Sequence, residues 1–190
     1  MTAATPAKSA RRKARELALQ GLFEWLLAGS DAGAIEAFLD ERYPTIKLDR
    51  ELFGSLLHGC IREAAALDEA LQPLLDRPSR ELSPVEHALL LLGAYEMRFL
   101  PEVPYKVIIN EAVDLAKSYG GTDGFKYVNG VLDRLALQLR SAETGPRDAA
   151  QRPTQRTRAP QPNPAAAVPV SIKPRSSRPA ARSRRGPGPG

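Results

Sequence analysis

The stretch FKYVNGVLDRLALQL, residues 125–139, decides the fold class. Its apolar residues follow one another at alternating steps of three and four positions: Phe125, Val128, Leu132, Leu135 and Leu139. That spacing places side chains on one face of an α-helix, whereas a half-buried strand would alternate at every second residue. The stretch therefore predicts a helix whose apolar stripe faces a core.

Residues typical of helix starts predict further helices upstream. Ser83-Pro84-Val85-Glu86 combines an N-cap serine, a first-turn proline and a capping-box glutamate ahead of an apolar run. Pro104 suits the first turn of another helix, and Asp31 can cap a short one.

The remaining helices follow from periodicity alone. A first helix is expected from about Ser9 to Leu27, and apolar residues between Leu52 and Leu74 mark one long helix, or two joined near Ala66. Only residues 107–109 are typical of a strand, and they lie within a helical pattern. We expect an all-α body of six or seven helices with short loops.

The formal net charge of +5 conceals three differently charged segments. Residues 1–20 hold five basic and one acidic side chains, residues 21–140 hold 12 and 19, and residues 141–190 hold ten and two. A polyanionic partner is therefore expected at the ends of the chain and not along its acidic middle.

Proline use separates a tail from the body. Ten of the 17 prolines lie between Pro146 and Pro189, in a stretch that contains no Leu, Phe, Tyr, Trp or Met. Such a stretch cannot bury enough apolar surface to offset the entropy that is lost when its backbone becomes ordered. We predict a flexible N-terminus over residues 1–7, one folded domain over residues 8–140, and a disordered basic tail over residues 141–190. The tail is either a sequence-tolerant contact to nucleic acid or an inert solubilising extension.

The sequence offers little material for catalysis. One cysteine excludes a disulfide framework, and two histidines supply little metal chemistry. His58 and Cys60 would point to different sides of a helix, and Cys60 falls on an apolar stripe that suits a core residue. We expect a binding protein with no enzymatic activity, metal or cofactor. Without a spanning apolar run or a signal peptide, it is expected in the cytoplasm and not in a membrane.

Three segments could carry binding chemistry. Arg11-Arg12-Lys13-Ala14-Arg15 would place three guanidiniums on one side of a helix, which suits RNA phosphates and bases, although a solvated, frayed N-terminus is the alternative. The second segment is residues 120–130, where Thr122 or Asp123 could cap the next helix. Tyr127 could stack on a base, or it could be an ordinary packed tyrosine. Gly130 suggests that another helix approaches closely at that position.

The third segment holds Asn110, Glu111 and Asp114, which could imitate a catalytic carboxylate cluster. The alternative is that Asn110 and Glu111 satisfy buried helix ends and that Asp114 decorates a solvent face.

Three motifs together resemble the NusB transcription antitermination family. They are residues 11–16 followed by Ala18, Gln20, Leu22 and Phe23, residues 103–117, and residues 125–133, in the family's order and spacing. The resemblance implies two three-helix bundles packed crosswise. It also implies binding to the single-stranded boxA element of ribosomal RNA transcripts, jointly with the ribosomal protein that acts as NusE, in an RNA polymerase antitermination complex with other Nus factors.

The resemblance also implies which residues bind. Those expected at RNA are Arg11, Arg12, Lys13, Arg15, Asp123, Lys126 and Tyr127. Those expected at NusE are Phe23 and Glu86. Two residues differ from the family's pattern. Leu91 stands at a position that is often basic in the family, and Leu74 stands at one that can be aromatic and near the RNA. The alternative function is a homodimeric or adaptor module with only non-specific RNA binding.

Overall fold

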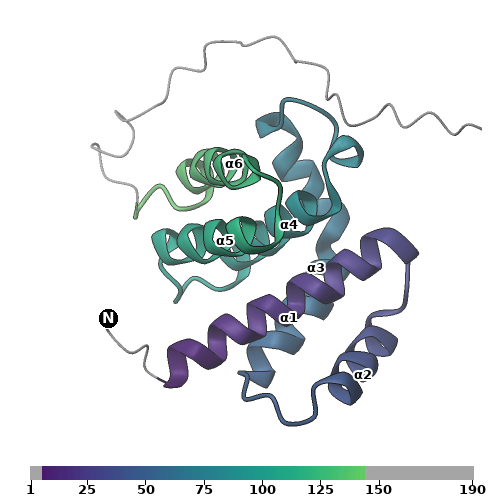
Figure 1. Ribbon diagram of the computed structural model, residues 1–190. Helices are drawn as coiled ribbons and strands as arrows, with labels where there is room; N and C mark the ends of the chain where they lie inside the picture. Colours follow the sequence, from purple (N-terminus) through teal and green to yellow (C-terminus); the bar gives the residue numbers. More distant parts are fainter. Residues whose placement is uncertain (1–5, 144–190) are drawn as a thin grey trace, which may run out of the picture. The chain divides into compact units, whose positions relative to one another are not determined.

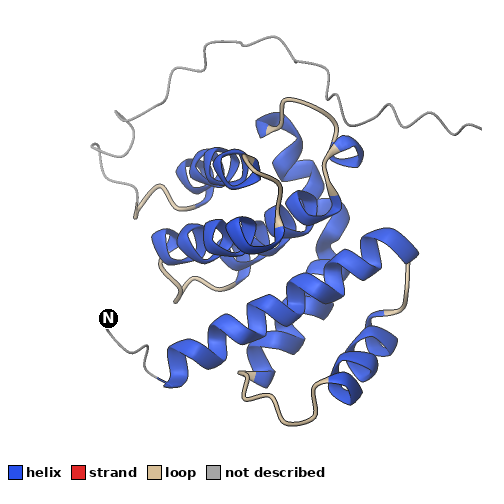
Figure 2. Ribbon diagram, viewed as in Figure 1, coloured by secondary structure: helices blue, strands red, loops and turns tan. Residues whose placement is uncertain are grey.

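The structure, a computed structural model, describes residues 6–143, which form helices joined by loops and turns with no strand among them (Figures 1 and 2). In chain order the elements are α1 (Pro6–Ala28), α2 (Ala32–Arg42), α3 (Arg50–Leu71), the short 3-10 helices η1 (Gln72–Leu74) and η2 (Ser79–Glu81), α4 (Pro84–Phe99), α5 (Tyr105–Tyr119) and α6 (Gly124–Leu139). The all-α prediction is confirmed. Residues 1–5 and 144–190, which include most of the predicted flexible N-terminus and tail, lie outside the described residues.

Polar side chains begin three of the helices. Asp31 accepts hydrogen bonds from two backbone N–H groups of α2, and Ser83 and Glu86 form the predicted capping box of α4. Asp49 caps α3 in the same way, which the sequence reasoning did not anticipate. Helix α3 runs through Ala66 without a break, so the alternative of two joined helices is wrong.

The helices pack as two groups of three. Helices α1, α2 and α3 contact one another, as do α4, α5 and α6, and α4 also packs on α1 and α3 (Figure 1). Residues 88–97 of α4 are all buried, which explains why this helix has almost no polar face. Leu91, at the position that is often basic in the family, lies fully inside this core. The predicted arrangement of two three-helix bundles is confirmed.

Glycines allow α4 to lie close to its neighbours. A Cβ atom on Gly59 of α3 would lie 2.2 Å from the Tyr95 ring, and one on Gly93 would lie 2.8 Å from Leu132. The close approach predicted at Gly130 is wrong, because the nearest atom to a Cβ there would be Arg134 Nη1 at 3.9 Å. Leu139, predicted to face the core, is exposed at the last turn of α6.

Arg140 joins the end of α6 to the end of α4. Its buried guanidinium donates to the carbonyl oxygens of Met97 at 2.6 Å and Leu100 at 2.9 Å, which the helix leaves without internal partners. Glu143 pairs with Arg140 and accepts from the Tyr105 backbone N–H at 3.2 Å. Specific contacts therefore extend three residues into the segment predicted as tail.

Candidate nucleic-acid interface

Arg15 lies in the core and not on the surface. Its side chain is 4% exposed, and its guanidinium donates three hydrogen bonds of 2.9, 3.1 and 2.5 Å to the carboxylate of Glu96 in α4. The prediction that Arg11, Arg12 and Arg15 present three accessible guanidiniums on one side is therefore wrong for Arg15. One turn further along its stripe comes Leu19, which is buried, so this stripe of α1 is the one that packs on the core.

A second carboxylate lies beside this buried ion pair. Glu111 of α5 is buried, and its Oε2 atom has no hydrogen-bond partner among the described residues. Burial raises the pKa of Glu96, the Arg15 guanidinium opposes this shift, and the nearby Glu111 charge adds to it. Asn110 is exposed, so the expectation that Asn110 and Glu111 satisfy buried helix ends is not met.

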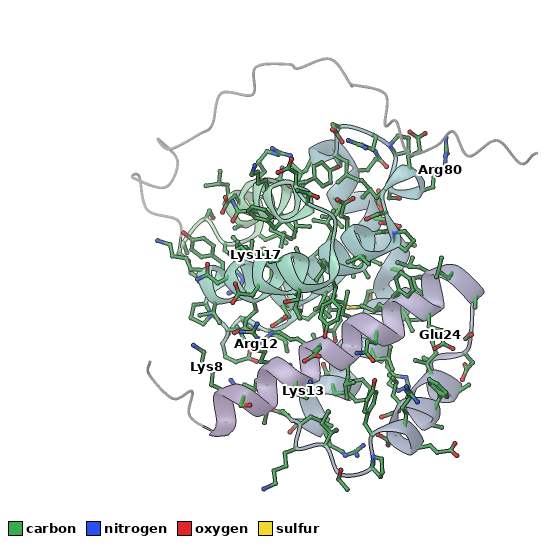
Figure 3. All side chains as sticks on the ribbon, viewed as in Figure 1. Lys8, Arg12, Lys13, Glu24, Arg80 and Lys117 are labelled. Carbon is green, nitrogen blue, oxygen red and sulfur yellow. The ribbon has the colours of Figure 1, made fainter. Side chains whose placement is uncertain are left out.

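Three other basic residues of α1 remain at least partly accessible, and each of the three lies near an acidic group. Arg11 Nε is 3.5 Å from Asp49, Arg12 Nη1 is 3.5 Å from Asp114, and Lys13 Nζ is 2.7 Å from Glu16. Figure 3 shows Lys8, Arg12 and Lys13 on the N-terminal half of α1. The pairs of Arg11 and Arg12 are exposed and contribute only about 0–1 kcal/mol, so an incoming phosphate can replace their carboxylates, whereas the pair of Lys13 with Glu16 is partly buried.

Side chains of α5 meet those of α1 along a line that we call the α1–α5 seam, formed by Arg12, Glu16, Asp114, Lys117 and Tyr119. Asp114 lies between Arg12 and Lys117, whose Nζ is 3.8 Å from its second oxygen. Tyr119 donates its hydroxyl to Glu16, and this hydrogen bond raises the pKa of Tyr119 to about 12. Partial burial would raise the pKa of Glu16, but hydrogen bonds from Lys13 and Tyr119 outweigh it and lower that pKa.

The seam continues to the start of α6 through an aromatic ring. Phe125 has the Lys117 ammonium 5.5 Å from its ring centroid and the Lys126 ammonium at 5.7 Å. Lys126 also pairs with Asp123 at 2.8 Å, and Asp123 makes no side-chain capping hydrogen bond, contrary to one of the two predicted caps. The structure thus connects Arg12 with Lys126 and Asp123 through residues of α5 that the sequence reasoning did not assign to the site.

Tyr127 belongs to a different neighbourhood. Its hydroxyl donates to Asp76 at 3.0 Å, and the Arg77 guanidinium carbon lies 5.7 Å from its ring centroid. Burial and the hydrogen bond to Asp76 raise the pKa of Tyr127 to about 12. The ring is half-buried, so it packs against the segment after η1 and keeps only part of its surface for stacking.

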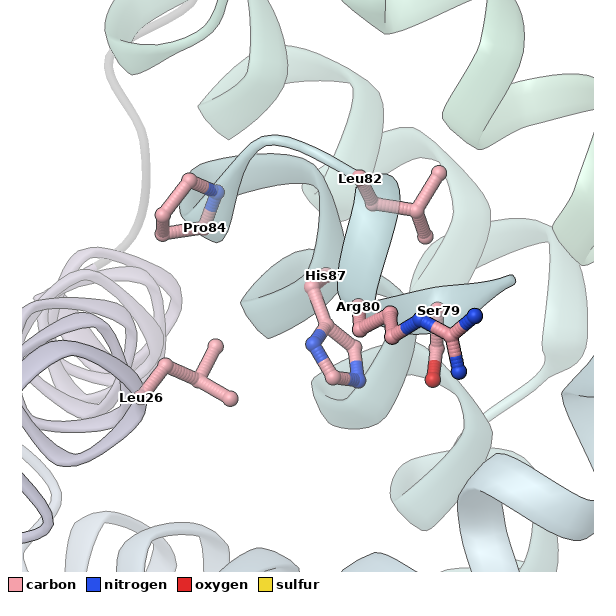
Figure 4. Close-up of a pocket in the computed structure, with 6 residues that line it drawn as sticks. All are labelled: Leu26, Ser79, Arg80, Leu82, Pro84 and His87. Carbon is pink, nitrogen blue, oxygen red and sulfur yellow. The ribbon is translucent and has the colours of Figure 1, made fainter. Parts of the chain in front are cut away.

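The predicted partner residues lie elsewhere. Phe23 is 37% exposed, and Leu27, one turn further along α1, is 62% exposed. Between them in sequence, Leu26 borders a pocket of about 300 Å³ (Figure 4). Its other lining residues come from η2, the link that follows it and the start of α4: Ser79, Arg80, Leu82, Pro84 and His87. No periodicity in the sequence pointed to this pocket, because its walls come from segments far apart in the chain.

Glu86 lies half-buried at the junction of two helices. Beyond its capping role, its Oε1 atom is 2.8 Å from the position that a Cβ on Gly124 would take. Glu86 therefore fits closely against the first residue of α6. Its half-buried carboxylate joins the starts of α4 and α6.

The remaining chemistry of residues 6–143 is sparse. Cys60 is fully buried as predicted, and burial raises the pKa of its thiol well above the ordinary range, which makes it a poor nucleophile. No three His, Cys, Asp or Glu side chains of these residues gather where they could hold a metal ion. Nor is any of their helices long and apolar enough to cross a membrane.

Comparison with known proteins shows the same family along most of the chain. Residues 12–137 match the model of the NusB family. A transcription antitermination protein NusB from Ralstonia pickettii is 59% identical over 145 residues, which cover 76% of this chain and 94% of the relative. One from Nitrosospira multiformis is 60% identical over 131 residues, 69% of this chain and 83% of the relative.

Two solved structures are also similar. One is described as antitermination factors NusB and NusE in complex with dsRNA. It is 29% identical, with a TM-score of 0.61, over 67% of this chain and 96% of that chain. The other, a T. maritima NusB, is 30% identical, with a TM-score of 0.59, over 66% of this chain and 89% of that chain.

Proposed function

The chain belongs to the NusB family, and on that premise we propose that it is a transcription antitermination factor that binds the boxA element of ribosomal RNA transcripts together with NusE. In this proposal it has no enzymatic activity and joins other Nus factors on RNA polymerase. The observation that carries the proposal is the basic surface that runs from Arg12 through Lys117 and Phe125 to Lys126. The similar solved complex of NusB, NusE and RNA supports it.

The first step of the argument concerns phosphates. Arg11 and Arg12 are exposed and held only by weak ion pairs, and Lys13 is partly accessible beside Glu16, so their cationic groups are available to a nucleic-acid backbone. Guanidiniums bind phosphates through paired hydrogen bonds, and they also stack on bases. We assign the sequence-independent part of RNA affinity to these residues and to Lys126. Arg15 is a positioning residue that fixes α1 on α4.

The second step concerns bases. Single-stranded RNA is recognised through splayed bases that stack on aromatic or guanidinium planes and through hydrogen bonds to base edges. Tyr127 with Arg77 beside its ring forms one such plane, and Asp123 offers a carboxylate that can accept from base N–H groups. We assign the preference for boxA to these two groups: Asp123, which lies beside Lys126 on the basic surface, and Tyr127 in its separate contact with Asp76 and Arg77.

The third step concerns the protein partner. Phe23 and Leu27 form an exposed apolar strip on the C-terminal half of α1, and the adjoining Leu26 leads into the pocket of Figure 4. Exposed apolar side chains next to a concave surface are typical of protein–protein contacts. We propose that NusE docks on this strip and pocket, and that Glu86 contributes by fixing the start of α4 on which the pocket depends.

The test compares RNA binding of the full chain and one variant. Binding to boxA RNA and to a scrambled RNA of equal length is measured across a salt series. Arg12→Ala is expected to weaken binding to both RNAs about three- to tenfold and to flatten the log–log salt slope by about 0.7, the value for one lost single-strand phosphate contact. Arg50→Ala is the matched control, because Arg50 is a similarly exposed arginine that pairs with Asp40 and is not assigned to RNA binding. Equal affinity of the unmodified chain for both RNAs would contradict the proposal.

The exposed strip also supports the alternative of a homodimer or adaptor with only non-specific RNA binding, because a second copy of the chain could cover it. Light scattering of the full chain with and without NusE separates the two cases. Phe23→Ala is expected to weaken the NusE complex, whereas Phe38→Ala, at an exposed phenylalanine of α2, leaves it unchanged. A dimer that persists when NusE is added, with no NusE complex at micromolar concentrations, would favour the alternative.

A further inference from the structure

Asp114 is an acidic residue at the middle of the proposed RNA surface. Its Oδ2 atom lies 3.5 Å from Arg12 Nη1 of α1, and its Oδ1 atom lies 3.8 Å from Lys117 Nζ of its own helix. All three side chains are about half exposed, at 47%, 48% and 54% for Asp114, Arg12 and Lys117. One carboxylate thus separates two cations that solvent can reach.

The fold holds together the two helices that carry these cations. Arg12 lies one turn before Glu16, which Tyr119 of α5 contacts, so α1 and α5 are joined next to the Asp114 contact. Arg15 holds the same part of α1 on α4, against which α5 also packs. The carboxylate of Asp114, a group with two anionic oxygens, therefore lies between two cations on helices that the fold holds together.

We infer that the position between Arg12 and Lys117 is a phosphate-binding site that Asp114 occupies when no RNA is bound, so that Asp114 competes with RNA for these two cations. The inference rests on the proposed function for the identity of the polyanion. A carboxylate and a phosphate accept the same charge-assisted hydrogen bonds from a guanidinium and an ammonium, so each can replace the other. The two contacts of Asp114 are long and exposed, which makes the carboxylate easy to displace.

The competition has a specific consequence for selectivity. Phosphate contacts carry no sequence information, so Asp114 lowers affinity for every RNA by the same factor. The preference for one sequence over another stays unchanged. In a cell rich in unrelated RNA, the effect of Asp114 is to reduce occupancy of those competitors at a given concentration of protein.

The experiment compares two variants of the full chain that each lose one carboxylate charge. Asp114→Asn removes the competitor, and Asp40→Asn removes an equally exposed carboxylate that pairs with Arg50. For Asp114→Asn we expect binding to boxA and scrambled RNA to tighten by about two- to fivefold at low salt, with an unchanged ratio between the two RNAs. The salt slope should steepen by up to about 0.7, the value for one additional single-strand phosphate. Asp40→Asn should change neither quantity beyond the small effect of net charge.

A double-mutant cycle with Arg12→Gln tests the mechanism directly. If Asp114 acts by occupying Arg12, its replacement should tighten binding less in the Arg12→Gln background than in the unmodified chain. Unchanged or weaker RNA binding by Asp114→Asn, or tightening equal to that of Asp40→Asn, would overturn the inference. A chain that binds both RNAs equally and still tightens on Asp114→Asn would support this inference while contradicting the proposed boxA preference.

Discussion

Removal of Arg15 gives the sharpest test of how the basic helix is held to the rest of the molecule. Arg15→Met keeps much of the side-chain volume but removes three hydrogen bonds to Glu96 and leaves that carboxylate buried without its cation. Breaking a buried ion pair by removing one partner costs about 3–5 kcal/mol. Since single domains are stable by only about 5–15 kcal/mol, the variant should lie close to the limit of folding.

Because Glu111 lies nearby, removal of Glu96 should cost less stability than removal of Arg15. Glu96→Gln leaves Arg15 charged, but Glu111 lies near enough to interact with it and has a carboxylate oxygen without a partner. We therefore expect Glu96→Gln to cost only about 1–3 kcal/mol. The double variant Arg15→Met with Glu96→Gln should be more stable than Arg15→Met alone, because no unpaired charge remains at position 96.

Urea unfolding of the full chain, followed by far-ultraviolet circular dichroism, measures these differences. The pKa of Glu96 is raised in the folded protein above its ordinary value of 4.5. At a pH between the ordinary pKa and the raised one, the folded state therefore binds more protons than the unfolded state. Stability therefore falls as pH rises through that window. Without Arg15 the pKa of Glu96 rises further, and the variant should regain stability more steeply than the unmodified chain as the pH falls toward the ordinary value of that carboxyl. A cost for Glu96→Gln equal to or above that of Arg15→Met, or no added pH dependence, would refute the reasoning.

Three further outcomes follow from contacts elsewhere in the fold. Arg140→Ala should destabilise the chain by about 2–4 kcal/mol in urea unfolding, because the carbonyl oxygens at the end of α4 lose a buried charged donor; a cost below about 0.5 kcal/mol would show that water replaces it. Gly59→Ala should lower the free energy of unfolding by about 1–3 kcal/mol through its clash with a tyrosine ring. Gly130→Ala, where the nearest atom would lie 3.9 Å from the new methyl group, should raise it by about 0.5–1 kcal/mol. Thermal melts check this pair of predictions, because the melting temperature should fall for the first variant and rise for the second. Truncation after Glu143 should leave the ratio of boxA to scrambled RNA affinity unchanged in a binding titration, since spaced cations contact phosphates without reading bases; a changed ratio would place sequence recognition in the tail.

Periodicity in the sequence predicted the helices because apolar spacing and capping residues act locally. Ser83 and Asp31 fulfil their capping roles through neighbours within three residues. The same reasoning misplaced Arg15, because it considered the charges of residues 11–15 by themselves. The buried stripe through Leu19 already contained the contrary indication.

The candidate site was predictable only in part, because its connections join distant segments. Nothing local to Arg12 indicates that Asp114, 102 residues away, lies against it. Phe125 packs against the core as its spacing predicted, but nothing in that spacing indicates that the ammonium groups of Lys117 and Lys126 lie about its ring. Gly130 suggested a tight crossing that occurs instead at Gly93, because a glycine in a sequence does not reveal which helix face it occupies.

The anchoring of α1 by Arg15 changes the thermodynamics expected of its RNA contact. Many arginine-rich RNA-binding segments become ordered only on their target and lose about 1–2 kcal/mol of backbone entropy per residue at that moment. Here Arg11, Arg12 and Lys13 stand on a helix that the core has already fixed one turn away. The protein side of the encounter is thus a rigid template, and the single-stranded RNA is the partner that must adapt its shape. Calorimetry should accordingly show a small heat-capacity change, without the large negative value that accompanies coupled folding.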